Sequence, residues 1–468
     1  MDQQATAQPA PRDFAPPAHP MRAAALRRAI IETGLPAPLQ SGLSVVEEVR
    51  NLLRAAAEVE HALLIQYLYA VYSIRTNTIS DTARQLRRKL LNIALEEMGH
   101  LLTVQNLLLV VGDSPYFDLD KTMFSGGLGG DHPFPLRLEP LSQDSLAKYV
   151  TAEGPSPDMI EDPALHANIK PIFARAEQTA GRNVNHIGAL LAKIFWLFQP
   201  NDDPHPLWPD LPFDLLPPGR HLAETNFVTA SEPWQAQPEE FNQSPVAPTS
   251  SENIYIIPVR SRIEALTALD MIAEQGEGWM LGRASHFERF IEVYEKFGTE
   301  LAAYIVPAPV NPHTSAAGAA EGLITHPTAL LWAQLANARY LMMLLKLGLG
   351  LRQPPQPGKV SPLSRIGLFQ SALNDEMTTI KMSAMQLVEF SDQGEVAGLP
   401  FELPDAPLPA NSDGIKRRLG EVAAAAQELI QQLSNLFDPG TPERDILDNL
   451  KQVDESLLVV LQPSPPIN

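Results

Sequence analysis

The sequence predicts an all-α protein whose central unit is a four-helix bundle. Two long stretches, 45–76 and 81–111, repeat apolar residues every three or four positions, the period of an α-helix with one buried face. The residues between them, 77–80, suit a turn that joins two antiparallel helices. Two later stretches, 184–198 and 261–277, repeat apolar residues in the same way and supply the remaining helices of the bundle.

Acidic residues lie inside the apolar faces of the two long helices. Glu60 shares its face with Leu53 and Leu63, while Glu97 and His100 follow the apolar positions of the second helix. An unpaired carboxylate in an apolar interior costs several kcal/mol and is rarely kept without a partner. A bound cation is one such partner. The alternative is that these positions form an ordinary solvated helix face.

The two helices also place these groups at one level. Glu60 and Glu97 are equally far from the turn, about 28 Å up each helix at 1.5 Å per residue. A Glu from one helix and Glu-x-x-His from its neighbour form half of a carboxylate-bridged two-metal site inside a four-helix bundle. Tyr67, seven residues after Glu60, fits this pattern or is simply part of the core. Glu58 and Glu96 are expected on the outer faces.

Composition restricts the chemistry. The chain has 468 residues, of which 44% are hydrophobic and 19% charged, so it is long enough to bury a large core. The 55 acidic and 35 basic residues give a net charge of -20, which argues against nucleic acid or an anionic membrane as a partner. A small-molecule substrate is expected instead. An apolar helix face, which bundles often expose, is compatible with a homodimer.

The chain contains no cysteine, which excludes disulfides, iron–sulfur clusters and zinc–thiolate sites. A metal must therefore be held by oxygen and nitrogen atoms. These ligands suit iron, and they also suit manganese and zinc. No stretch of 18 uninterrupted apolar residues and no secretory signal pattern is found, so a cytoplasmic location is expected.

Shorter elements are expected between the bundle helices. Residues 1–40, rich in Pro, Ala and Arg, are expected to form a flexible tail, and Ser142 begins a short helix that runs to about Val150. The Pro-rich insertion 200–250 contains scattered aromatic residues, which favour a packed cover over a disordered loop. Residues 254–259 are expected to form a short strand that pairs with residues 136–138 in a small ribbon.

The fourth helix of the bundle supplies candidates for the other half of the metal site. Glycines interrupt this helix near residue 276, and Ser285 with Glu288 forms a capping box that restarts a helix. That restart places His286 in the first turn, so that it folds back over Glu274 and Glu277. These three residues are the candidates, although their separation is not that of a Glu-x-x-His pair.

After three prolines between residues 307 and 312, the pattern predicts a separate C-terminal helical region, 307–468. Its expected helices cover residues 325–351, 361–390, 412–437 and 441–461. They form a second helical layer beside the bundle-containing unit, residues 41–306.

Several segments together resemble a known family. They are LRAAAEVEHALLIQYLY (53–69), ALEEMGHLLTVQNLLLVVGDSPYF (94–117), PLRLEPL (135–141) and IAEQGEG (272–278), the last followed by Ser285-His286-Phe287. Over residues 44–312 the chain is similar to the ferritin-like family named after the iminophenyl-pyruvate dimer synthases of violacein and indolocarbazole biosynthesis. The resemblance implies a ferritin-like bundle with an iron-type dimetal centre, and it favours Glu277 and His286 as ligands.

One departure from the family concerns the third helix. The family tends to have a Glu near the position of Ala189, where this chain reads His186-Ile187-Gly188-Ala189. If this alignment holds, the site lacks one carboxylate, or His186 substitutes for it. A mononuclear centre is then an alternative to a metal pair.

The sequence therefore favours a non-haem iron oxidoreductase of small-molecule or secondary metabolism that uses dioxygen or peroxide. Tyr67 would donate a hydrogen bond to a ligand or act as a redox neighbour. Two alternatives remain: an imine-coupling synthase of the iminophenyl-pyruvate dimer type, and a non-catalytic metal-binding or scaffold protein with a degenerate site. The residues expected to hold metal are Glu60, Glu97, His100, Glu274, Glu277 and His286.

Overall fold

The structure is a computed structural model, and it is helical throughout its described part. It describes residues 42–119, 137–155, 160, 162–181, 184, 186–200, 205–208, 221–228, 234–241, 255–276, 284–316, 321–355 and 360–461. Residues 1–40, expected as a tail, lie outside this part. No β-strand occurs among the described residues, where only isolated bridges join Ile74 to Ile305 and His313 to Leu323. The all-α prediction is confirmed.

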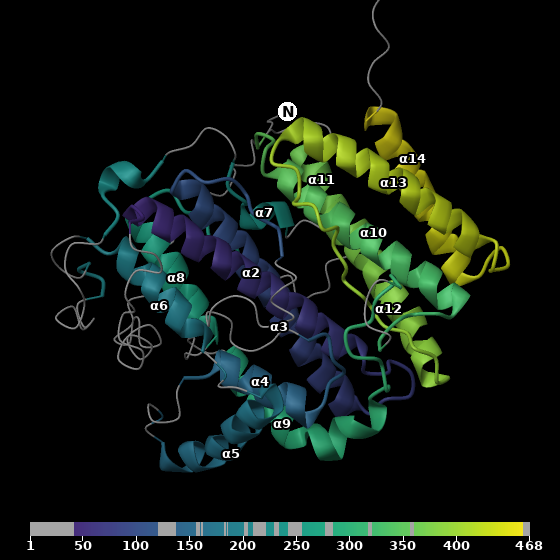
Figure 1. Cartoon of the computed structure of the whole chain (residues 1–468), viewed down its shortest axis with the longest axis horizontal. Coiled ribbons are helices and arrows are strands. Elements are labelled where there is room, and N and C mark those ends of the chain that lie inside the picture. The colour runs from purple at the N-terminus through teal and green to yellow at the C-terminus, as the bar shows by residue number, and fades with distance from the viewer. Residues whose placement is uncertain are drawn as a thin grey trace, which may run out of the picture.

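Helices α2 (Val45–Tyr72) and α3 (Asp81–Val110) form the long antiparallel hairpin that the sequence predicts (Figure 1). The expected capping box of Ser44 and Glu47 starts α2. Helix α3 ends just before Gly112, whose φ of 72° lies in the left-handed region that glycine adopts without strain. This hairpin is the frame on which the other helices pack.

The other two helices of the bundle are each interrupted. Helices α6 (Ile187–Phe198) and α8 (Arg262–Gly276) pack together along one half of the hairpin. Helices α4 (Gln143–Glu153) and α9 (His286–Lys296) pack together along the other half (Figure 1). Helix α5 (Pro163–Ala180) covers α4. The breaks between α4 and α6, and between α8 and α9, therefore place helix ends in the middle of the bundle.

The connections pack closely where they are described. Trp208, from the Pro-rich insertion, is buried and donates a hydrogen bond of 3.0 Å from Nε1 to Asp270 of α8. Residues 255–259 run along α3, where Asn106 and Thr103 bond to the backbone of Ile257. The prediction of a strand here is wrong, because side chains of α3 take the bonds that a ribbon partner would need. Short turns complete this half: η4 (Glu224–Asn226), α7 (Pro238–Phe241), π-helix η6 (Phe297–Leu301) and η7 (Ala302–Tyr304).

The C-terminal helices form a layer beside the bundle (Figure 1). Helix α10 is its centre, and it packs on the neighbouring helices of the layer, while α12 also contacts α2. These helices match the four predicted ones, except that a π-helix, η8, divides the second. Their bounds are α10 Pro327–Gly350, α11 Arg365–Ser371, η8 Ala372–Glu376, α12 Met377–Asp392, α13 Ser412–Ser434 and α14 Pro442–Leu461.

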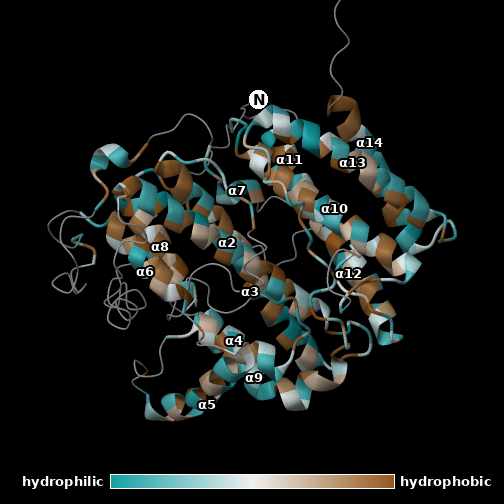
Figure 2. Ribbon diagram, viewed as in Figure 1, coloured by the Kyte–Doolittle hydropathy of each residue, from teal (hydrophilic) through white to brown (hydrophobic). Residues whose placement is uncertain are grey.

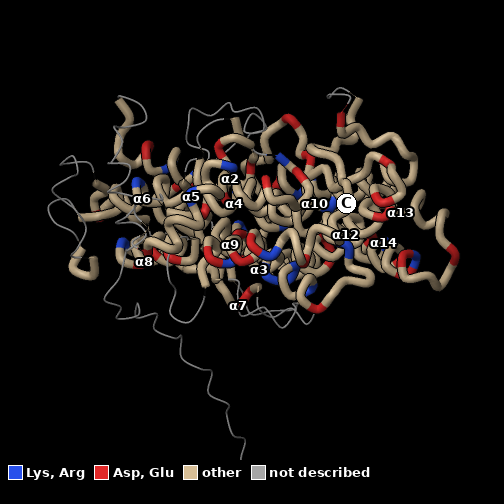
Figure 3. Tube along the Cα trace, turned by 90° about the horizontal axis from the view of Figure 1, so that it is seen from below, with Lys and Arg blue, Asp and Glu red and all other residues tan. Residues whose placement is uncertain are grey.

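Buried apolar side chains form one continuous core that includes residues of both the bundle and the C-terminal layer. Hydrophilic and hydrophobic residues alternate along α13 and α14, as expected for helices with one exposed face (Figure 2). Acidic and basic residues are interspersed along the described chain (Figure 3). None of the described helices combines the length and the apolar character that crossing a membrane requires.

Candidate metal centre

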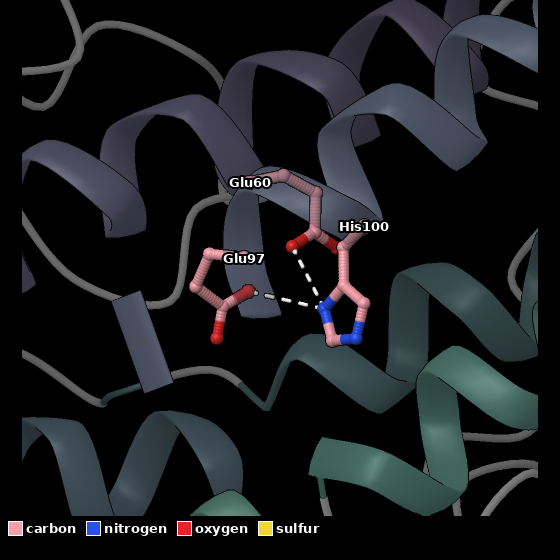
Figure 4. Close-up of side chains that lie close together, drawn as sticks. All are labelled: Glu60, Glu97 and His100. Atoms are coloured by element: carbon pink, nitrogen blue, oxygen red, sulfur yellow. Dashed lines mark hydrogen bonds and ion pairs between the residues drawn. The ribbon is translucent and has the colours of Figure 1, made fainter. Parts of the chain in front are cut away.

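Helices α2 and α3 bring Glu60, Glu97 and His100 together in the interior (Figure 4). Nδ1 of His100 lies 3.1 Å from Oε2 of Glu97 and 3.5 Å from Oε2 of Glu60. The three residues are only 2%, 1% and 3% exposed for Glu60, Glu97 and His100. The predicted register of the hairpin is thus correct, and we call this group the first cluster.

Glu97 also belongs to a second cluster, with Glu153 and His286. Nδ1 of His286 lies 2.8 Å from Oε1 of Glu97 and 3.5 Å from Oε2 of Glu153. All three side chains are buried. Because each oxygen of Glu97 approaches a different histidine, this one carboxylate lies between the two clusters.

The interrupted helices explain how the second cluster is assembled. Glu153 is the last residue of α4, and His286 is the first residue of α9. The predicted capping box of Ser285 and Glu288 fixes the start of α9, and so fixes the direction of His286. Helix ends inside the bundle therefore supply two of the buried groups.

Nε2 of each imidazole, the nitrogen that faces away from the cluster, lies next to a polar side chain. Nε2 of His100 lies 3.0 Å from Oε1 of Gln275, and Nε2 of His286 lies 2.9 Å from Oε2 of Glu96. Glu96 also forms an ion pair with Arg289 of α9. The expectation that Glu96 faces solvent is wrong, because α9 covers that side of α3.

Glu58 was also expected on an outer face, but it is 7% exposed. Its carboxylate accepts a hydrogen bond from the hydroxyl of Tyr116, which follows α3 in the chain. The helical period of α2 alone does not show that this loop folds over it.

Tyr67 is buried next to the second cluster. Its hydroxyl donates a hydrogen bond of 2.6 Å to Oε1 of Glu153, and its ring meets Tyr149 and Phe290 edge-on. Burial and the negative charge of Glu153 both raise the pKa of Tyr67 well above its ordinary value. Tyr67 is therefore a hydrogen-bond donor that orients one carboxylate of the cluster.

The shared carboxylate and its neighbours have strongly altered proton affinities. Burial raises the pKa of Glu60 to about 8. Burial would lower the pKa of His100, but the carboxylates of Glu97 and Glu60 outweigh it and raise the pKa to about 10. Burial likewise opposes ionisation of Glu97, yet His286 and His100 hold its pKa well below the usual range. Without a metal, protons on the histidines balance the buried carboxylates, and metal binding would release them.

The residues fit a pair of cations. Among the described residues, Oε1 of Glu97 and Nδ1 of His286 are buried, lie 2.8 Å apart and have no well-aligned hydrogen-bond partner. A cation between them would satisfy both atoms. The donor set consists of carboxylate oxygens and imidazole nitrogens, which iron, manganese and zinc accept. A cavity of about 10 Å³, room for one water-sized molecule, adjoins both clusters.

The predicted residues on the fourth helix fall in different places. His286 lies in the second cluster, and Glu277 lies outside the described residues. Glu274 is half-buried on α8 and belongs to neither cluster of the described residues, because its neighbour Gln275 is the one that faces His100.

The carboxylate expected near Ala189 comes from elsewhere. Glu153 of α4 lies in the second cluster, so another helix supplies a buried carboxylate beside Glu97 and His286 although Ala189 carries none. His186 does not replace it: Nδ1 of His186 bonds to the backbone oxygen of Gly154 at 2.5 Å, at the start of α6. The apolar pattern does not indicate Glu153, because it predicts a helix that ends near Val150, whereas α4 runs to Glu153. The glycine that follows it, Gly154, is the one local sign that the helix ends at Glu153.

A family model described as Ferritin-like matches residues 53–295. The chain therefore belongs to the ferritin-like family, as its sequence resemblance implies. The fold and the buried carboxylate–histidine clusters agree with this assignment, since this family builds metal sites inside its four-helix bundle.

Two named relatives are similar in sequence. Dichlorochromopyrrolate synthase of Lentzea aerocolonigenes is 26% identical over 420 residues, which cover 80% of this chain and 38% of that protein. The 2-imino-3-(indol-3-yl)propanoate dimerase of Chromobacterium violaceum is 35% identical over 149 residues, covering 26% of this chain and 15% of that protein. The matched parts are thus less than half of either relative.

Among solved structures, a crystal structure of a ferritin like protein from Caulobacter vibrioides is similar with a TM-score of 0.43. The two sequences are 16% identical, and the match covers 76% of this chain and 97% of the other.

Proposed function

We propose that this protein is a metal-dependent oxidoreductase of small-molecule metabolism that holds non-haem iron and uses dioxygen or peroxide. The observation that carries the proposal is the shared position of Glu97 between two buried clusters. Buried carboxylates are costly unless positive charge neutralises them, and bound metal ions would do so in place of the protons on the two histidines. Membership of the ferritin-like family supports the same reading.

In this proposal the first cluster would hold one ion and the second cluster the other, and Glu97 would be the carboxylate common to both. A negative bridge between two cations reduces their mutual repulsion. When bound, iron would supply the electrons that reduce dioxygen or peroxide while an organic substrate is oxidised. Zinc would fit the same donors but has no redox chemistry of its own.

The protein's own groups would prepare the site. Tyr67 holds Glu153 in one orientation by its hydrogen bond, and burial of the clusters keeps bulk water out. The small cavity between α6 and α8 has apolar walls that include Ile187, Leu191 and Ile272. It has room for one water-sized molecule and not for an aromatic substrate.

Oxidation of added Fe²⁺ by dioxygen tests this proposal. The full-length wild type, loaded anaerobically and then mixed with air-saturated buffer, should oxidise iron much faster than the same buffer without protein. Glu97→Ala should lose this rate, whereas Glu421→Ala, an exposed change on α13, should keep it. Full activity in Glu97→Ala would refute the proposal.

A second candidate function is the coupling of amino-acid-derived imines. The names of the two relatives favour it, because one is a dimerase of 2-imino-3-(indol-3-yl)propanoate. Indole-3-pyruvate or phenylpyruvate would be supplied with ammonium ions, and mass spectrometry would detect a dimer. A dimer formed by wild type and absent with His286→Ala supports coupling. Iron oxidation without any dimer supports oxidation of another substrate.

The third reading, a non-catalytic metal-binding or scaffold protein, was favoured by the missing carboxylate near Ala189. Glu153 supports a complete set of ligands instead. Bound iron that never reacts with dioxygen or peroxide would restore the scaffold reading.

A further inference from the structure

The two clusters offer nearly the same donor atoms to a cation. Each consists of two carboxylate oxygens and Nδ1 of one histidine. The distances from Nδ1 to the carboxylates are 3.1 and 3.5 Å for His100, and 2.8 and 3.5 Å for His286. The rings lie against each other, with centroids 5.5 Å apart and planes 28° from parallel. By their direct donors alone, the clusters should bind alike.

The clusters differ in the group that accepts a hydrogen bond from Nε2 of each histidine. Nε2 of His100 faces the neutral amide oxygen of Gln275 at 3.0 Å. Nε2 of His286 faces a carboxylate oxygen of Glu96 at 2.9 Å, and Arg289 pairs with the same carboxylate from the following turn of α9. In both cases Nε2 carries the proton and donates, which leaves the lone pair of Nδ1 for a cation.

An ionised acceptor changes the strength of an imidazole ligand. A carboxylate that accepts from the outer N–H makes the imidazole a better electron donor, and loss of such a partner typically weakens metal binding by about 10–100-fold. A neutral amide oxygen orients the ring but polarises it less, because it carries no full charge. Arg289 binds the same oxygen, Oε2 of Glu96, and lessens its charge, but that oxygen still accepts from Nε2 of His286 and the carboxylate keeps its full formal charge.

We propose that the two clusters are unequal, with the second cluster binding a divalent cation more tightly and filling first, because Glu96 and Gln275 position and polarise their histidines differently. This inference rests on the proposed metal site and adds an order of loading to it. Glu96 and Gln275 are positioning residues, since each acts through a histidine.

Titration of Mn²⁺ into the metal-free, full-length chain tests the order. Calorimetry should give two classes of affinity, and electron paramagnetic resonance should show an isolated Mn²⁺ signal first and a coupled pair afterwards. His100→Ala should keep the tighter class, whereas His286→Ala should keep only the weaker one. The opposite assignment, or two equal affinities in wild type, would overturn the inference while leaving the proposed site intact.

Substitution of Gln275 and Glu96, the partners of the two Nε2 atoms, gives the sharper test. Gln275→Glu should tighten the weaker class by about 10–100-fold and bring the two classes together. Glu96→Gln should weaken the tighter class by a similar factor. A gain of affinity in Gln275→Glu cannot come from a damaged fold, and far-UV circular dichroism checks Glu96→Gln. An unchanged affinity in Gln275→Glu would contradict the inference, and a wild type that binds no Mn²⁺, Fe²⁺ or Zn²⁺ would overturn it together with the proposed function.

Discussion

The hydroxyl of Tyr67 on α2 donates a buried hydrogen bond of 2.6 Å to Oε1 of Glu153, the last residue of α4. Tyr67→Phe leaves that carboxylate oxygen without its donor, which costs about 1–3 kcal/mol in a buried position. We expect a lower midpoint of urea unfolding for the metal-free variant. Tyr304→Phe, in a partly buried residue outside both clusters, should unfold like wild type. Equal midpoints for all three proteins would mean that the bond contributes nothing.

Burial of His61 should make the stability of the protein depend on pH. It is fully buried, and its Nε2 accepts a hydrogen bond from the hydroxyl of Tyr340 in the C-terminal layer. Burial lowers its pKa from 6.5 to about 4, so the unfolded chain takes up this proton at a higher pH than the folded one. The stabilisation is present above pH 6.5 and is lost as the pH falls towards 4, on the order of 3 kcal/mol.

Unfolding by urea between pH 4 and 7 checks this, with metal-free protein throughout. His61→Gln has no proton to gain and should show a flatter pH dependence than wild type. Gln393→Ala, at an exposed residue that does not titrate, should keep the slope of wild type. If His61→Gln retains that slope, other groups are responsible.

A buried ion network holds the C-terminal layer together. Arg339 of α10 makes two hydrogen bonds, of 2.8 and 2.6 Å, to the carboxylate of Asp454 on α14, and both side chains are fully buried. Asp454→Ala leaves the guanidinium without one of its counter-charges. We therefore expect the free energy of unfolding, measured with urea, to fall by about 3–5 kcal/mol. Glu455→Ala, at the exposed neighbour, is the control and should lose less than about 0.5 kcal/mol. Arg339→Met combined with Asp454→Leu should lose less than Asp454→Ala, and a larger loss would contradict this account.

Gly99 allows a backbone segment to approach α3. A Cβ at this position would lie 2.7 Å from the backbone oxygen of Tyr255, which cannot rotate away. Gly99→Ala should therefore destabilise the protein by about 1–3 kcal/mol, despite the better helix propensity of alanine. Gly420→Ala on α13 is the matched control, since its nearest neighbour is 3.8 Å away, and it should be neutral or stabilising. The midpoint of thermal unfolding of each variant checks this prediction. Equal changes of the midpoint in the two variants would argue against a close contact at Gly99.

Local rules were enough to predict the frame of the site. The apolar period placed Glu60, Glu97 and His100 on buried faces, and the turn between the long helices set their common level. The capping box at Ser285 correctly placed His286 in a first helical turn. Each of these inferences depends on residues close together in the chain, where period and capping determine structure.

The remaining groups depend on contacts that are distant in sequence. Glu96 shares its side of α3 with Lys89 and Asn92, and it is buried because α9 packs over it. Glu153 lies at a helix end beyond the predicted boundary, and the break that turns it inward is not visible in the apolar pattern. Whether Glu274 or Gln275 faces His100 depends on the rotation of α8 about its axis. The sequence does not determine this rotation, because α8 is short and has apolar residues on several sides.

The number of iron ions bound per chain tests the shared role of Glu97 most directly. Purified wild type and Glu97→Ala, loaded anaerobically with Fe²⁺ and freed of excess metal, would be analysed by plasma mass spectrometry. We predict two ions per chain in wild type and almost none in Glu97→Ala, with unchanged helical content in both. Equal iron content in the two proteins, or none in wild type, would contradict the account.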